Sequence, residues 1–149
     1  MGADRFVEAE RAYQRACDLA PRRGNTFSAL AMALLAQGRS EEALKAATRE
    51  PHEAWRDTAL AIVHHAAGHR AASDEALRNL AEKFGETMAY QVAEAHAARG
   101  EADAAFEWLE QARSDRDSGL AMVKTNYRFR PLHGDPRWKP FLAKVGFAA

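Results

Sequence analysis

Three neighbouring histidines are the first residues in this 149-residue chain whose type and spacing suggest chemistry. His65 and His69 are four residues apart, so one face of a helix could present both to a metal ion, with His64 beside them. A zinc enzyme needs at least a third ligand and an activated water, and the sequence has no HExxH-like arrangement. Gly68 also interrupts the helix just before His69. We therefore expect no bound metal.

Cys17, the single cysteine, is the one candidate thiol nucleophile. A catalytic cysteine requires a neighbouring base, and no histidine lies close to it in the sequence. The acid pairs Glu41–Glu42 and Glu101–Asp103 follow expected helix starts, where carboxylates interact favourably with the helix dipole. No Gly-rich phosphate loop, serine nucleophile elbow or paired-carboxylate motif stands out. We expect that the protein is not an enzyme and needs no cofactor.

The charge balance argues against nucleic acid as a partner. Lys and Arg number 21, as do Asp and Glu, whereas a nucleic-acid binder needs a basic face. The last part of the chain has a local basic bias, in Arg128, Arg130, Arg137, Lys139 and Lys144. The same segment contains the apolar residues Phe129, Leu132, Trp138, Phe141 and Leu142. These residues favour another role for the segment, as a terminal cap that covers the last helices.

Neither a membrane segment nor an export signal is visible. No apolar run approaches the roughly 20 residues that cross a bilayer, and the first residues contain no apolar core of a signal peptide. One cysteine allows no internal disulfide. We expect a cytoplasmic protein with no membrane partner.

The composition predicts an all-α protein, because Ala, Leu, Glu, Arg and Gln dominate and Val, Ile and Thr are few. Three short turns, centred on Gly38, Gly68 and Gly100, each end one apolar-periodic stretch and begin another. Glycine suits the C-terminus of a helix. The glycines are 30 and 32 residues apart, so the chain is expected to contain repeated antiparallel helical hairpins.

The residues around these turns recur at matching positions in the three units. They are Phe27, Leu30, Ala31, Leu34, Gly38 and Ala43 in the first; Leu60, Ala61, His64, Gly68 and Leu77 in the second; and Val92, Ala93, His96, Gly100, Ala105 and Ala112 in the third. This pattern resembles the tetratricopeptide repeat (TPR), a unit of about 34 residues. It departs from the family in the short first unit, which ends before Pro51, and in Ser73, where the family prefers Ala.

The resemblance implies a single domain, a right-handed α-solenoid of about three and a half TPR-like hairpins with a C-terminal capping helix. Its expected parts are a half repeat at 6–21, repeats at 24–51, 53–84 and 86–117, and a cap at 118–149. In such repeats His64 and His96 occupy the position of a buried aromatic residue. The stretch Ala105–Leu109, with Pro131–Leu132 and Asp135–Arg137 after it, also resembles the C-terminal TPR region of bacterial regulators that carry a cyclase, kinase or DNA-binding domain.

The same resemblance implies a scaffold or adaptor that binds a peptide or protein in its concave groove. Helical geometry nominates as groove residues Asn25, Ser28, Met32, Leu35, Trp55, Thr58, His65, Thr87, Tyr90 and Glu94. Trp55 has a second interpretation, packing between neighbouring hairpins.

The half repeat suggests an alternative function. The half repeat would consist of the second helix of a repeat without the first helix that packs against it. One side of this helix would then be uncovered at Phe6, Val7, Tyr13 and Leu19. We therefore expect self-association, as a homodimer through residues 6–20. In this alternative the chain is a regulatory or oligomerisation segment of a larger bacterial signalling protein, with no independent ligand.

Overall fold

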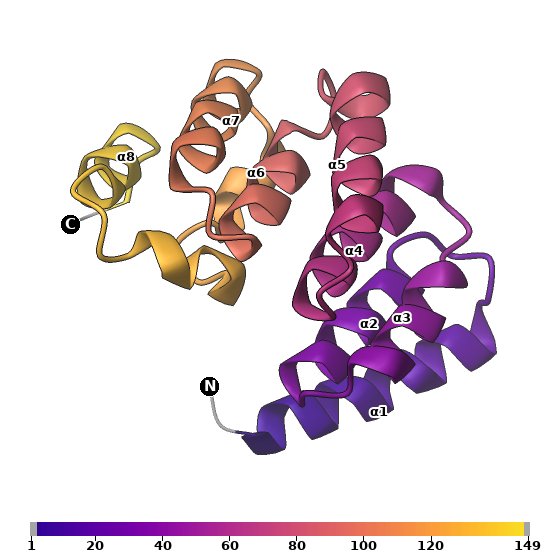
Figure 1. The fold of residues 1–149 in the computed structure, drawn as a ribbon. Coiled ribbons are helices and arrows are strands. Elements are labelled where there is room, and N and C mark those ends of the chain that lie inside the picture. Colours follow the sequence, from indigo (N-terminus) through magenta and orange to yellow (C-terminus); the bar gives the residue numbers. More distant parts are fainter. Residues whose placement is uncertain (1–2, 148–149) are drawn as a thin grey trace. The chain divides into compact units, whose positions relative to one another are not determined.

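The computed structural model describes residues 3–147, and every regular element among them is a helix (Figure 1). The elements in order are α1 (Ala3–Leu19), α2 (Thr26–Ala36), α3 (Ser40–Thr48), α4 (Glu53–Ala66), α5 (Arg70–Phe84), α6 (Ala89–Ala98), α7 (Ala102–Ser114), the 3₁₀ helices η1 (Ser118–Met122) and η2 (Tyr127–Leu132), and α8 (Trp138–Lys144). The all-helical prediction is confirmed. The expected hairpins coincide with α2–α3, α4–α5 and α6–α7.

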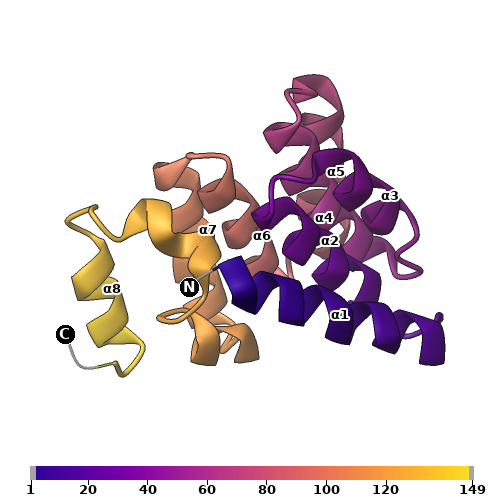
Figure 2. The ribbon, with the colours of Figure 1, turned by 90° about the horizontal axis from the view of Figure 1, so that it is seen from below.

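The chain forms two compact units that divide within α5, one up to Asn79 and one from Leu80 on. In the first unit α2 is central and contacts α1, α3 and α4. In the second unit α6 is central and contacts α7, η1 and η2 (Figure 2). Within residues 3–147, no helix combines the length and the apolar character that a membrane span requires.

The central helices are apolar around most of their circumference because each is covered from several sides. In α2 the buried run is almost continuous from Thr26 to Leu34. In α6 it includes Tyr90, Val92 and Ala93. Their hairpin partners α3 and α7 instead bury one stripe and leave a charged face in solvent. Each unit therefore has its core around one central helix.

The predicted glycine turns adopt one conformation three times. Gly38, Gly68 and Gly100 have φ of 76°, 80° and 76°, in the left-handed region where glycine avoids a steric penalty. At the first turn Gly38 N–H donates to the Leu35 carbonyl and Arg39 N–H to that of Leu34, the pair of bonds of a Schellman motif. The other two turns form the equivalent bonds. A repeated local sequence thus gives a repeated chain reversal.

Small residues are buried at matching positions of the two helices of each hairpin. They are Ala31 and Ala43, Ala61 and Ser73, and Ala93 and Ala105, each at most 1% exposed. Ser73 is the departure from the repeat pattern that the sequence showed. Its hydroxyl donates a 2.6 Å hydrogen bond to the Ala61 carbonyl, so the buried oxygen is satisfied. A side chain of nearly alanine size is therefore retained in the middle hairpin.

Two central helices receive their N-terminal caps from carboxylates far along the chain. At α2 the N-cap position holds Asn25, whose φ of 68° leaves its side chain without a capping bond. The carboxylate of Glu50, 1% exposed, accepts instead from the backbone N–H groups of Asn25 and Ser28, at 3.0 and 3.1 Å. It also accepts from the Ser28 hydroxyl and the His52 N–H. Donors that the helix leaves unpaired are thereby satisfied.

The second unit uses the same device at α6. Asp117, in the loop after α7, accepts from Tyr90 N–H at 3.2 Å and from Gly119 N–H at 2.8 Å. In both units the loop after the second helix of a hairpin returns a carboxylate to the start of the first helix. This similarity is a property of the fold, because the two acids do not occupy equivalent sequence positions.

The cap at α2 predicts a large loss of stability for Glu50→Ala. The variant removes the acceptor of the buried Ser28 N–H and of the partly buried Asn25 and His52 N–H groups, and we expect it to lower the free energy of unfolding by about 2 kcal/mol or more. Glu75→Ala, at an exposed position of α5, is the control and should change it by about 0.5 kcal/mol at most. Urea unfolding followed by circular dichroism measures both. Equal midpoints for the two variants would contradict a capping role for Glu50.

Candidate functional site

The side chains predicted to line a concave groove divide into buried and accessible ones. Buried are Ser28, Met32, Thr58, Tyr90 and Glu94; exposed or partly exposed are Asn25, Leu35, Trp55, His65 and Thr87. The buried residues are not accessible to a partner in this structure. A central helix that is covered on several sides buries positions well outside one core stripe, as α2 and α6 do. None of the accessible residues lines the hollow between α7 and α8 or the hollow among α1, α2 and α3.

Trp55 is partly buried at the start of α4. Its backbone carbonyl accepts a 2.9 Å hydrogen bond from the hydroxyl of Ser28 on α2. Ser28 therefore joins α4 to the carboxylate cap of α2 and has a structural role in the first unit.

Tyr90 and Glu94 belong to a polar cluster inside the second unit. The Tyr90 hydroxyl accepts from Asn126 Nδ2 at 2.9 Å, and its ring makes an edge-to-face contact with Phe129. A Cβ at Gly119 would lie 2.6 Å from the Tyr90 ring, so only glycine permits this close approach of η1. The Glu94 carboxylate forms an ion pair with Arg128. These contacts hold both 3₁₀ helices on α6.

The electrostatics of this cluster support a structural role. Burial raises the pKa of Tyr90, and the nearby Glu94 carboxylate raises it further. Burial disfavours the charged form of Arg128, but the Glu94 carboxylate outweighs that effect and the pKa of Arg128 is raised. Tyr90 thus stays a neutral phenol at ordinary pH, and Glu94 and Arg128 form a charged pair.

The histidines lie at the glycine turns. His64 and His96, which the repeat resemblance places at a buried aromatic position, are partly buried. His64 Nδ1 is 3.2 Å from His69 Nδ1 across the turn at Gly68, and burial lowers the pKa of His64. His96 Nδ1 is 3.0 Å from a carboxylate oxygen of Glu101 across the equivalent turn. The chain reversal brings these side chains together and leaves His65 exposed.

Neither a metal centre nor a thiol site is assembled by the described residues. No three His, Cys, Asp or Glu side chains between residues 3 and 147 gather in the manner of a metal site. Cys17 is 2% exposed in the contact of α1 with α2, and burial raises its pKa. A buried thiol with a raised pKa is a weak nucleophile at neutral pH.

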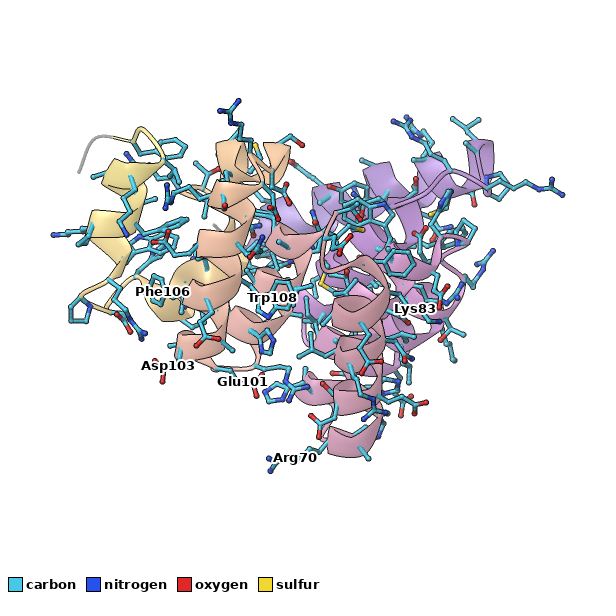
Figure 3. All side chains as sticks on the ribbon, turned by 90° about the horizontal axis from the view of Figure 1, so that it is seen from above. Arg70, Lys83, Glu101, Asp103, Phe106 and Trp108 are labelled. Atoms are coloured by element: carbon cyan, nitrogen blue, oxygen red, sulfur yellow. The ribbon has the colours of Figure 1, made fainter. Side chains whose placement is uncertain are left out.

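An open groove of about 760 Å³ lies in the second unit, between α7 and the segment that contains α8. We call it the α7–α8 groove. It is lined by Asp103, Phe106, Glu107, Glu110, Pro136, Arg137, Pro140, Phe141 and Lys144. Figure 3 shows Phe106 on the side of α7 that faces α8, and Trp108 on the opposite side. The groove therefore has an aromatic floor and charged edges.

The floor is continuous with the core of the second unit. Phe106 and Phe141 belong to the buried cluster that also contains Phe129 and Trp138. Pro136 and Pro140 are exposed and form part of the wall on the α8 side. Proline has a fixed φ, so this wall has little backbone freedom. Apolar surface of this kind, with polar groups at its edge, is typical of a binding site.

Ion pairs hold the two walls together. Arg137 Nη1 is 2.8 Å from Asp103, and Lys144 Nζ is 2.8 Å from Glu110. Arg137 also lies over the Phe106 ring, 4.5 Å from its centroid. Hydrogen bonds from Arg137 lower the pKa of Asp135 to about 2, and bonds from Lys144 and Arg113 lower the pKa of Glu110. The groove edge is thus charged at neutral pH.

A smaller hollow of about 290 Å³ lies in the first unit, among α1, α2 and α3. Its floor includes Phe27, which the Arg49 guanidinium covers at 4.6 Å from the ring centroid. Arg39 bridges Glu10 of α1 and Glu42 of α3, at 2.8 and 2.5 Å. This hollow has less than half the volume of the α7–α8 groove, so it has less room for a large ligand.

The predicted cap is buried, as the sequence indicated. Phe129, Leu132, Trp138, Phe141 and Leu142 all join the core of the second unit. The basic residues of this segment, which suggested a nucleic-acid patch, include three that are ion-paired within the unit: Arg128, Arg137 and Lys144. The sequence did not indicate the groove, because Phe106 and Phe141 carried only a packing signal.

The polar cluster predicts different effects for two substitutions of Tyr90. Tyr90→Ala removes a buried ring and should lower the free energy of unfolding by about 3–5 kcal/mol. Tyr90→Phe keeps the ring and loses one hydrogen bond, a cost of about 1 kcal/mol. Since the pKa of Tyr90 is raised on folding, its contribution is present below the tyrosine pKa of about 10 and is lost as pH rises above it.

Urea unfolding between neutral pH and pH 11 measures these effects. Tyr13→Ala is the control, because Tyr13 is 39% exposed and its loss should change stability by about 0.5 kcal/mol at most. A stable, native-like Tyr90→Ala variant would show instead that the ring lies outside the core.

The chain was compared with family models, curated proteins and solved structures, and none of the three comparisons finds a match.

Proposed function

We propose that this protein is a protein-interaction module that binds a peptide or protein segment in the α7–α8 groove. The observation that carries the proposal is a hollow of about 760 Å³ whose floor is formed by the largely buried rings of Phe106 and Phe141 and whose wall includes two exposed prolines. Pockets of about 300–1,000 Å³ with apolar floors and few polar groups are the usual sites of ligand anchoring. An apolar anchor residue of a partner would fill this groove.

A binding role suits this groove better than catalysis because most of its charged groups already have partners. Asp103 pairs with Arg137, and Glu110 pairs with Lys144. A general acid or base needs freedom to exchange a proton near neutral pH, whereas Arg113 and Lys144 hold the pKa of Glu110 below its usual value. The ion pairs instead keep the groove walls in place.

The scaffold that we propose for the module is a TPR-like α-solenoid. Three features support it: the Schellman turns at Gly38, Gly68 and Gly100, the small buried residues of each hairpin, and the antiparallel helices on either side of each turn. The binding surface proposed here differs from the concave groove that the repeat resemblance implies, since half of the nominated groove residues are buried.

Filling the groove tests this proposal. Pro140→Trp places an indole against the α7 wall and should abolish the binding of peptides selected from a random display library, with unfolding midpoints unchanged within a few degrees. Lys139→Trp is the matched control, since Lys139 is the exposed neighbour of Pro140 and does not line the groove. Isothermal titration calorimetry measures the loss. Equal affinity of both variants for every selected peptide would place the binding site elsewhere.

One observation favours a second function, self-association through α1. Tyr13 and Leu19 are 39% and 80% exposed, as expected for a helix that lacks part of its cover. Phe6 and Val7 are only partly exposed, and Gln37 and Arg39 bind Glu10 on the same helix. A contact between copies would therefore involve Tyr13 and Leu19 more than Phe6 and Val7.

Light scattering coupled to size-exclusion chromatography tests this second function. We expect a dimer at high micromolar concentration that dissociates in the double variant Tyr13→Glu, Leu19→Glu, because the charges cannot be buried unpaired. Ala12→Glu, at a neighbouring exposed position, is the control. A monomer at every concentration would exclude α1 as a dimer interface.

A further inference from the structure

Along the α7–α8 groove, one acid has no ion-pair or hydrogen-bond partner among the described residues. Asp103, Glu107 and Glu110 are four and three residues apart on α7, so they lie on one face of the helix and all line the groove. The opposite wall carries Arg137 and Lys144, which neutralise Asp103 and Glu110. Between these two cations in the sequence, that wall contributes Pro140 and Phe141, which have no charge.

Glu107 is exposed and forms no ion pair or hydrogen bond with the described residues. Its helical neighbours do not compensate for its charge, because the residues three and four positions away are Asp103, Ala104, Glu110 and Gln111. The groove therefore presents the Glu107 carboxylate midway along its length, between the Arg137–Asp103 and Lys144–Glu110 ion pairs.

We infer that the α7–α8 groove selects a partner segment that carries a lysine or arginine side chain between apolar side chains, with the cation at Glu107. The inference rests on the proposed function and names the chemistry of the partner. The long apolar stem of Lys or Arg would lie across the phenylalanine and proline surface, and its charged end would reach the carboxylate. An acidic segment would be repelled by α7.

The magnitude of the effect follows from the exposure of Glu107. An exposed ion pair contributes up to about 1 kcal/mol, equivalent to about fivefold in affinity. The contribution should weaken with added salt, because the charges are accessible to counter-ions. Apolar anchoring would then supply most of the affinity, and Glu107 would supply the discrimination between cationic and other segments.

Three synthetic peptides provide the test. They have the sequence Ala-Leu-X-Phe-Ala with both ends blocked, and X is lysine, norleucine or glutamate. Each is titrated to millimolar concentration into the ¹⁵N-labelled full chain, and amide shifts on α7 and α8 report binding. We expect the lysine peptide to bind about fivefold more tightly than the norleucine peptide, and the glutamate peptide to bind weakest.

Matched variants separate this inference from the proposed function. Glu107→Gln should remove the preference for lysine and retain the affinity for the norleucine peptide, whereas Glu86→Gln, at an exposed site outside the groove, should leave both unchanged. Equal binding of the lysine and norleucine peptides to α7 and α8 would overturn the inference and leave the proposed function intact. Absence of shifts there with all three peptides would overturn both.

A second copy of the chain is a further possible occupant that the same measurement detects. Shifts of the α7 and α8 amides that depend on protein concentration without any peptide would identify it and overturn the inference. The shifts expected for a basic segment are independent of protein concentration.

Discussion

The close approach of the two helices in each hairpin is the constraint on which this structure depends. A turn of three residues at Gly38, Gly68 or Gly100 reverses the chain, so the helices on either side must pack directly against each other. Alanine or serine at the buried positions permits this approach, since a longer side chain would separate the helices. The serine is accommodated because the other helix supplies a carbonyl acceptor.

A second requirement follows because the short central helices α2 and α6 are covered by other helices on most sides. The N-terminus of a central helix leaves several N–H groups unpaired, and burial would make them costly. The chain meets this requirement with Glu50 and Asp117, which return from the loops after α3 and α7. In the second unit Arg128 and Asn126 extend the arrangement, so that Glu94 and Tyr90 are satisfied as well. Polar contacts in these cores therefore hold the loops in position as well as satisfying the ends of the helices.

The α7–α8 groove arises from the way the C-terminal segment completes the second unit. Its aromatic residues close the core, but Phe106 and Phe141 keep an accessible edge between α7 and α8. Ion pairs link the two walls, Arg137 to Asp103 and Lys144 to Glu110. A segment that completes the core thus also forms one wall of the groove.

The sequence by itself determined the helices and the turns between them. Both depend on local properties: the helical period of apolar residues, and the left-handed conformation that Gly38, Gly68 and Gly100 adopt more easily than other residues. Only the tertiary structure decided which polar residues are buried and where an accessible hollow remains. The Glu50 cap, the Glu94–Arg128 pair and the Asp103–Arg137 pair join residues 22 to 34 positions apart. Such contacts depend on how whole helices pack, and no local pattern in the sequence encodes them.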